Sequence, residues 1–270
     1  MQVLSPRVDW SGFLASIPAA PSRVLMLDYD GTLAPFQPRP ERAVPYPGIR
    51  EALESLIEAG GTRIVIVSGR PAGDVAPLLA LKQPPEIWGG HGWERLLPSG
   101  ELRRQEPSLK VKVSLEEAAA AAAEAVRIGG RLERKRASIA LHWRGLPTLT
   151  AAKIQSRARA AWETFVAEDA LQLLAFDGGL ELRAAGLNKH HAVKAVLSET
   201  VGNSAIAYLG DDLTDEDAFA AVKPRGLAVL VRSELRETQA DVWLQPPREL
   251  IAFLYRWRVE ATAEDRGDGV

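Results

Sequence analysis

Short, almost wholly apolar runs recur along this chain, and several of them stop at a polar or acidic turn. The runs lie at Arg23–Asp28, Thr62–Ser68, Ala205–Leu209 and Leu227–Val231. They do not alternate polar with apolar residues, which is the pattern of strands that are buried on both faces of a sheet. An amphipathic stretch at Gly48–Gly60 has the spacing of a helix that covers such a sheet. The chain is therefore expected to fold as an α/β protein with a parallel sheet.

The middle of the chain has a different rhythm. Ser114-Leu-Glu-Glu has the spacing of a capping box and predicts the start of an Ala-rich helix. Two strands, a second helix and two further strands joined by Asp177-Gly-Gly follow, which is an α+β pattern. We therefore expect two domains, a core formed by residues 1–104 and 186–270 and an inserted α+β cap at 105–185.

Composition excludes several classes of protein. The formal net charge is -2, without the basic excess that nucleic-acid binding usually requires. There is no cysteine, which excludes thiolate metal sites and cysteine nucleophiles and fits a reducing compartment. The sequence contains neither a secretory signal pattern nor an apolar run of the roughly 20 residues that span a bilayer. We expect a monomeric, cytoplasmic protein that binds neither nucleic acid nor membranes.

Acidic and small polar residues follow three of the apolar runs. These segments are Asp28–Thr32, Ser68–Arg70 and Gly210–Asp212. Ligands of open α/β sheets bind at the carboxyl ends of the strands, and parallel strands bring those ends to one edge. A cluster of Asp28, Asp30 and Asp211 would repel itself without a cation. Oxygen ligands without a neighbouring His or Cys favour Mg²⁺.

Such a site is suited to phosphoryl transfer. A carboxylate beside Mg²⁺ can attack phosphorus and form an acyl-phosphate. A second carboxyl two residues further on could protonate the leaving oxygen and then activate water. Gly31 permits close approach of the backbone to the phosphoryl group, while Ser68 and Lys189 would neutralise its oxygens. Lys189 begins a predicted helix, where the dipole disfavours a cation, so its position favours a role that faces an anion.

Three segments resemble motifs of the haloacid dehalogenase superfamily of phosphatases. The first motif is at Asp28–Phe36, the second at Val67–Arg70 and the fourth at Gly210–Asp217. More narrowly, the chain resembles the trehalose-6-phosphate phosphatases from about Arg23 to Val231. This narrower resemblance rests on Leu33–Phe36, His91–Glu94, Lys135, Ser138, His142–Arg144, Glu181–Arg183 and Asn188–Lys189. The resemblance implies a Rossmann-like parallel-sheet core of the haloacid dehalogenase type with an inserted α+β cap.

The resemblance also implies a role for each acidic residue of the core. Asp28 would be the nucleophile and a Mg²⁺ ligand, and Asp211 would be a further ligand. Asp30 would be the general acid and base, and its backbone carbonyl would bind the metal. Asp212 and Asp215 would support the metal site or orient the motif lysine.

Substrate contacts are implied in both domains. Ser68 and Lys189 would hold the phosphate, and the cap would read the sugar hydroxyls. The implied substrate-binding residues are Gly69, Arg70, His91 and Glu94 in the core and Lys135, His142, Arg144 and Glu181 in the cap.

Two features depart from the family pattern. Arg134-Lys135-Arg136 has three cations where the family has a single lysine, and the spacing to His142 favours Lys135. His190-His191 follows the motif lysine where relatives often have Gly, so either a bulkier residue crowds the phosphate loop or the helix begins one residue later.

These assignments predict a Mg²⁺-dependent phosphatase that hydrolyses trehalose 6-phosphate through an aspartyl-phosphate intermediate. Only cap residues separate this substrate from sucrose phosphate or from mannosyl- and glucosyl-phosphoglycerate. A phosphomutase is another alternative; it would need activation by a bisphosphate and would interconvert isomers without net release of phosphate. A non-catalytic sugar-phosphate-binding module is a further alternative, against which Asp28, Asp30, Lys189 and Asp211 together argue.

Overall fold

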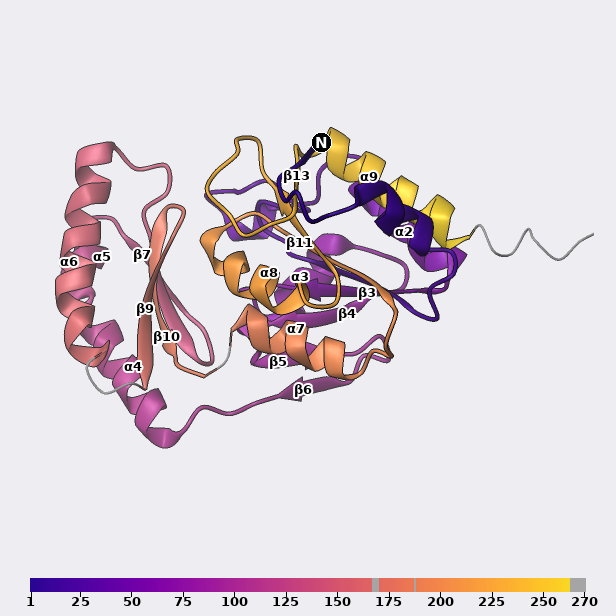
Figure 1. The fold of residues 1–270 in the computed structure, drawn as a ribbon. Coiled ribbons are helices and arrows are strands. Elements are labelled where there is room, and N and C mark those ends of the chain that lie inside the picture. Colours follow the sequence, from indigo (N-terminus) through magenta and orange to yellow (C-terminus); the bar gives the residue numbers. More distant parts are fainter. Residues whose placement is uncertain (167–169, 187, 263–270) are drawn as a thin grey trace, which may run out of the picture. The chain divides into compact units, whose positions relative to one another are not determined.

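The computed structural model describes residues 1–166, 170–186 and 188–262 and divides into two compact units. Unit 1 comprises Met1–Arg103 and Asn188–Val270, and unit 2 comprises Arg104–Leu187. Figure 1 shows the ribbon of both units with many of their elements labelled. Among the helices of the described residues, none has the length and apolar character that crossing a membrane requires.

A nine-stranded sheet runs through the described part of unit 1, in the order β1-β13-β12-β11-β2-β3-β4-β5-β6. The strands from β13 to β4 are parallel, while β1 and β5 pair antiparallel with their neighbours. This confirms the expected parallel α/β core. The strands are β1 (Gln2–Val3), β2 (Arg23–Leu27), β3 (Thr62–Val67), β4 (Glu86–Gly89), β5 (Glu94–Leu96), β6 (Leu102–Arg104), β11 (Ala205–Gly210), β12 (Leu227–Val231) and β13 (Val242–Leu244).

Helices cover both faces of this sheet, as Figure 1 shows. Leu25 and Leu27 of β2 belong to the core under α1, α2, α3 and α9, whereas Val24 and Met26 belong to the core under α7 and α8. Both faces of the strand are thus apolar, which explains its unbroken hydrophobic run. The helices are α1 (Trp10–Ser16), α2 (Ile49–Ala59), α3 (Ala72–Leu79), α7 (Lys189–Ser198), α8 (Glu216–Val222) and α9 (Arg248–Ala261).

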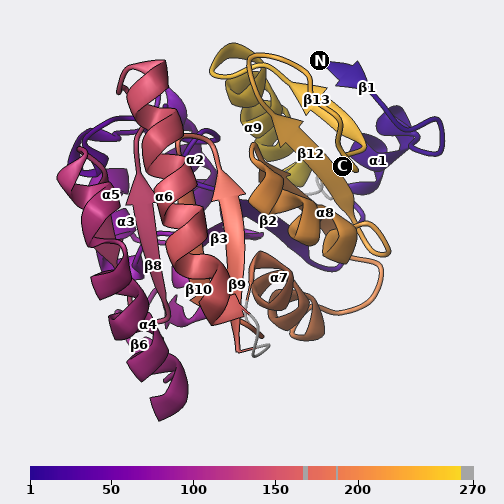
Figure 2. The same cartoon turned by 90° about the vertical axis from the view of Figure 1, so that its left-hand side faces the viewer.

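The described residues of unit 2 form a four-stranded antiparallel sheet, ordered β7-β8-β10-β9, with helices on one face (Figure 2). Leu141 and Leu180 pair across β8 and β10 and are buried. Glu181 alternates with them and therefore lies on the other face. Trp162 is buried, and its Nε1 donates to the Ala118 carbonyl at 2.8 Å, which joins α6 to α4. The elements are α4 (Leu109–Ala121), α5 (Ala123–Arg127), β7 (Arg131–Arg134), β8 (Ser138–His142), α6 (Thr148–Val166), β9 (Leu171–Phe176) and β10 (Gly179–Ala184).

The start of the Ala-rich helix differs from the expectation. The helix begins at Leu109, because Ser108 is its N-cap and accepts a hydrogen bond from the Val111 N–H at 3.3 Å. Val111 and Leu115 are both buried and lie one turn apart, so packing extends the helix before Ser114.

Several short elements had no sequence signal. Strands β5, β6 and β13 are each three residues long and carry charged or aromatic residues that do not alternate clearly. Helices α1 and α9 were also missed, although α9 carries buried Leu250, Phe253, Leu254 and Trp257 at helical spacing. The described part of the chain also contains 3₁₀ turns at η1 (Pro40–Arg42), η2 (Gly90–Gly92) and η3 (Leu213–Asp215).

Trp257 provides a test of the packing between α9 and the sheet. Its side chain is fully buried, its ring lies 6.0 Å from that of Phe253, and its Nε1 donates to Thr62 Oγ1 at 3.2 Å. Trp257→Ala should lower the free energy of unfolding by about 3–5 kcal/mol, measured by urea denaturation. Tyr255→Ala on the same helix is the control, because Tyr255 is exposed. An equal loss in both variants would contradict this account.

Candidate active site

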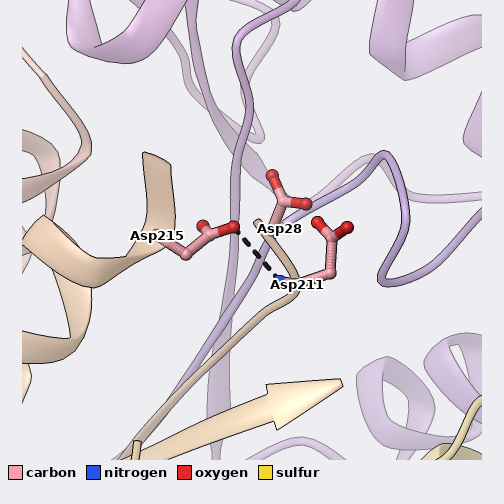
Figure 3. A group of neighbouring side chains, drawn as sticks. All are labelled: Asp28, Asp211 and Asp215. Atoms are coloured by element: carbon pink, nitrogen blue, oxygen red, sulfur yellow. Dashed lines mark hydrogen bonds between the residues drawn. The ribbon is translucent and has the colours of Figure 1, made fainter. Parts of the chain in front are cut away.

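The carboxyl ends of β2 and β11 lie side by side and bring two of the predicted aspartates together. Leu27 is in register with Leu209, and the Asp28 N–H donates to the Leu209 carbonyl at 2.8 Å. Asp28 and Asp211 therefore follow two adjacent strands, as parallel pairing requires. Figure 3 shows them with Asp215, and carboxylate oxygens of all three lie within 4.8 Å of one another. Asp28 and Asp211, two of the three carboxylates predicted to cluster, thus lie together, and Asp215 is the third member of the group in place of Asp30.

Lys189 places a buried ammonium within this acidic group. Its Nζ donates to Asp28 Oδ1 at 2.6 Å and to Asp215 Oδ1 at 2.7 Å. The residue is the first of α7, a helix whose apolar face packs on the sheet, and Asn188 is the N-cap. The ammonium is thus fixed beside the aspartate predicted to be the nucleophile. The helix dipole disfavours a positive charge at the N-terminus of α7, and the negative charges of Asp28 and Asp215 offset this repulsion.

Asp215 is engaged by protein donors on both of its oxygens. Oδ1 accepts from Lys189 and from the Tyr208 hydroxyl at 2.5 Å, and Oδ2 accepts from the backbone N–H groups of Asp211 at 3.1 Å and Asp212 at 3.0 Å. A carboxylate offers about four acceptor positions, and these donors take them. Asp215 therefore contacts Lys189 and holds the backbone of Asp211 and Asp212, and its expected support of a metal site stays a prediction.

The Asp211 carboxylate is in a different situation. Its Oδ1 is buried and has no hydrogen-bond partner in the described structure. A buried polar atom left in this state costs free energy unless a ligand completes it. Gly31 has φ +87, and a Cβ there would lie 2.1 Å from Asp211 Oδ2, so only glycine leaves room for this carboxylate. The open oxygens of Asp211 and Asp28 fit a hard divalent cation such as Mg²⁺.

Burial and excess negative charge dominate the electrostatics of the site. Burial raises the pKa of Asp28 to about 7, although the Lys189 charge opposes the shift. Burial, with the charge of Asp28, also raises the pKa of Asp211 well above its ordinary value. Burial alone would lower the pKa of Lys189, but Asp215 and Asp28 outweigh it and raise that pKa. The ammonium therefore stays charged, while the aspartates need a further cation to ionise together.

Asp30 lies on the same loop but has a separate partner. Arg70 Nε donates to Asp30 Oδ2 and Arg70 Nη2 donates to Asp30 Oδ1, both at 2.6 Å. Ser68, buried at the end of β3, accepts a hydrogen bond at Oγ from the Arg70 N–H at 3.1 Å. The paired hydrogen bonds between Arg70 and Asp30 thus join the second predicted motif, Val67–Arg70, to the first, Asp28–Phe36.

His91 and Glu94 support the loop that carries Ser68. The His91 N–H donates to the Ser68 carbonyl at 3.0 Å, and a Cβ on Gly69 would meet the His91 ring at 2.7 Å. Glu94 Oε2 accepts from the Ala72 N–H at 3.0 Å. Both side chains are buried in unit 1. These contacts give each residue a structural role, and their predicted contact with substrate stays a prediction.

The predicted residues of unit 2 form three polar groups. Lys135 Nζ and the Ser138 hydroxyl donate to Glu181 Oε1, at 3.1 Å and 2.7 Å. Arg144 contacts Asp177 on the hairpin between β9 and β10, at 3.5 Å. His142 Nε2 lies 2.7 Å from Glu133 Oε2.

Glu133 titrates far from its ordinary range. Burial alone would raise the pKa of Glu133, but the hydrogen bond with His142 and the charge of Lys135 outweigh it and lower the pKa to about 2. Glu133 therefore stays ionised beside His142.

The two departures from the family pattern acquire a structural explanation. Arg134 faces Glu116 on α4 at 3.7 Å and Arg136 pairs with Glu106, so Lys135 is the cation of this run that pairs with Glu181. His190 Nδ1 lies 3.2 Å from the Asp217 carbonyl and is half-buried, directed toward α8.

Sequence reasoning missed Tyr208, Ser138 and Glu133 as members of these groups. Tyr208 lies inside an apolar strand, and only the fold aims its hydroxyl at Asp215. Ser138 lies in the segment that carries the family resemblance, but no role was assigned to it, and Glu133 has no local signal that distinguishes it from other strand residues.

Comparison with known proteins identifies the family. The family model for trehalose-phosphatase matches residues 26–245. A trehalose-phosphate phosphatase of Mycobacterium ulcerans is 32% identical over 250 residues, covering 87% of this chain and 61% of that protein. The chain thus spans about three-fifths of the length of this curated relative.

Solved structures show the fold. The C-terminal domain of the C. albicans trehalose-6-phosphate phosphatase has a TM-score of 0.82 at 21% identity, covering 96% of this chain and 99% of that one. A haloacid dehalogenase-like hydrolase from B. subtilis has a TM-score of 0.60 at 14% identity, covering 86% of this chain and 99% of that one. The α/β core with its α+β unit is therefore a haloacid dehalogenase-type fold, and the chain belongs to the trehalose-phosphatase family.

Proposed function

We propose that this protein is a Mg²⁺-dependent phosphatase that releases phosphate from trehalose 6-phosphate through an aspartyl-phosphate on Asp28. The observation that carries the proposal is the buried arrangement of Lys189 between Asp28 and Asp215, next to an Asp211 oxygen without a partner. Membership of the trehalose-phosphatase family supports the substrate. A cytoplasmic location and a monomeric state stay predictions.

The core residues divide the reaction between them. An oxygen of Asp28 attacks phosphorus while the bond to the sugar oxygen breaks, and Asp30 gives that oxygen a proton. Asp30 then takes a proton from water as the water oxygen attacks the acyl-phosphate and the Asp28 carboxylate leaves. Lys189 keeps its charge throughout and stabilises the phosphoryl oxygens, with the Ser68 hydroxyl as a further donor.

The metal would be held by carboxylates of Asp28 and Asp211 and by the Asp30 backbone carbonyl. The donor set consists of oxygen alone, and the unpartnered Asp211 Oδ1 is the atom that a cation would complete. When bound, Mg²⁺ supplies positive charge that neutralises the phosphoryl oxygens and permits both aspartates to ionise.

Unit 2 is proposed to be the cap that selects the sugar. Lys135, Ser138 and Glu181 form a hydrogen-bonded group on the face of the sheet opposite its helices. Charged donors and acceptors of this kind discriminate strongly between hydroxyl patterns, because a mismatched ligand leaves them unpaired.

The proposal predicts selective phosphate release from a panel of sugar phosphates. With Mg²⁺, trehalose 6-phosphate should give the highest kcat/KM, and EDTA should abolish release. The panel includes sucrose phosphate and mannosyl- and glucosyl-phosphoglycerate. A higher kcat/KM for one of these substrates would leave the proposed phosphatase mechanism intact. It would show that the proposed specificity of unit 2 for trehalose 6-phosphate is wrong. Isomer formation without phosphate release would indicate a phosphomutase.

Asp28→Asn should lower kcat by about 10⁴-fold or more, because an amide oxygen does not form the acyl-phosphate. The variant should keep the wild-type circular dichroism spectrum. Asp74→Asn, which removes an exposed carboxylate of unit 1, is the matched control and should retain activity. Residual turnover near the wild-type rate in the Asp28 variant would rule out the covalent mechanism.

Mg²⁺ should raise the melting temperature of the wild-type protein, because binding to the folded state alone stabilises it by about 2.7 kcal/mol at 100 times Kd. Asp211→Asn should lose this stabilisation. Without metal it should be at least as stable as wild type, since a neutral amide replaces a buried carboxylate that has one oxygen without a hydrogen-bond partner. An unchanged response to Mg²⁺ in this variant would remove Asp211 from the metal site.

A further inference from the structure

The contact between Arg70 and Asp30 has the geometry of a two-point clamp. Two nitrogens of one guanidinium face the two oxygens of one carboxylate, each pair at 2.6 Å. A parallel pair of charge-assisted hydrogen bonds fixes both the position and the plane of a carboxyl group, which a single hydrogen bond does not.

The guanidinium is itself held from several directions. Arg70 Nη1 donates to the Pro40 carbonyl at 2.8 Å, which joins the guanidinium to the start of η1. Its charged end lies 5.7 Å from the centre of the Tyr29 ring, and the side chain is 14% exposed. Tyr29 is buried and its hydroxyl donates to the Ala43 carbonyl at 2.6 Å. The clamp is therefore built on fixed groups of the core.

From this geometry we propose that Arg70 is a positioning residue that acts through Asp30, in place of the substrate-binding role expected for it. The inference rests on the proposed function, in which Asp30 moves the proton. Two of the guanidinium nitrogens already face Asp30 and the third donates to Pro40, so the group is committed to the protein. A phosphate-binding role would require it to leave these partners.

The hydrogen bonds from Arg70 leave Asp30 able to transfer a proton. Each carboxylate oxygen has about two acceptor positions, and the fork uses one on each oxygen. The others can face the oxygen of the departing sugar in the first step and the attacking water in the second. A carboxyl group that is held in one plane makes these transfers from a fixed position, and loss of such positioning costs on the order of 10²-fold in rate.

The test separates a loss of proton transfer from a loss of binding. With the full chain, Mg²⁺ and trehalose 6-phosphate, Arg70→Ala and Arg70→Lys should each lower kcat by on the order of 10²-fold. Lysine keeps the charge but cannot form the fork. The inhibition constant for inorganic phosphate, which needs no proton transfer, should change less than about twofold. Arg42→Ala, which removes an exposed arginine at the end of η1, is the control and should resemble wild type.

A double-mutant cycle with Asp30→Asn gives the second readout. If Arg70 acts through Asp30, Arg70→Ala should cause little further loss in the Asp30→Asn background. Losses that multiply, or a phosphate inhibition constant that rises while kcat is retained, would overturn the inference. Absence of turnover by the wild-type protein would overturn the proposed function together with the inference. The outcomes above, obtained with an active wild-type protein, would overturn the inference alone.

Discussion

The buried ammonium of Lys189 is the interaction on which the site depends. It lies 2.6 Å from one carboxylate and 2.7 Å from another, and all three groups have lost nearly all contact with water. Removing charges from water costs several kcal/mol for each ion, and only close opposite charges and hydrogen bonds repay it. The Tyr208 hydroxyl and two backbone N–H groups provide the remaining hydrogen bonds to Asp215. One ammonium faces both Asp28 and Asp215, and Asp211 Oδ1 has no hydrogen-bond partner, so the group of carboxylates favours a further cation.

This arrangement requires the parallel sheet. Asp28 follows β2, Asp211 follows β11 and Ser68 follows β3, and the register of these neighbouring strands brings their ends to the same level. Lys189 arrives from the other end of the sequence on α7, packed against the face that also carries α8. The site is therefore assembled from segments far apart in the chain, each rigidly held by a strand or helix that has an apolar core beneath it.

The loops around the site are shaped by close packing as much as by charge. Gly31 is required because the Asp211 carboxylate occupies the space of a side chain, and Gly69 is required because the His91 ring does the same. His91 and Glu94 also hold the backbone on either side of Gly69 and Arg70. Residues that the sequence suggests as substrate contacts thus also hold the loop backbone in place. Their position in a sequence motif does not reveal this structural role. The same applies to Arg70, whose partner Asp30 lies on another strand end.

The sequence by itself determined the fold class and which residues lie at the carboxyl ends of the strands, because unbroken apolar runs are typical of parallel strands buried on both faces, and here they end in Asp-x-Asp, Ser-Gly-Arg and Gly-Asp-Asp. It did not determine pairings that join distant segments. The Arg70–Asp30 fork, the Tyr208–Asp215 hydrogen bond and the Lys135–Glu181 pair depend on strand register and on which face of a strand each side chain takes. Short strands such as β6 and the helix start at Leu109 also depended on packing, since local propensity there is weak. Tertiary structure decided these features because burial, not local pattern, selects the partner of a charged group.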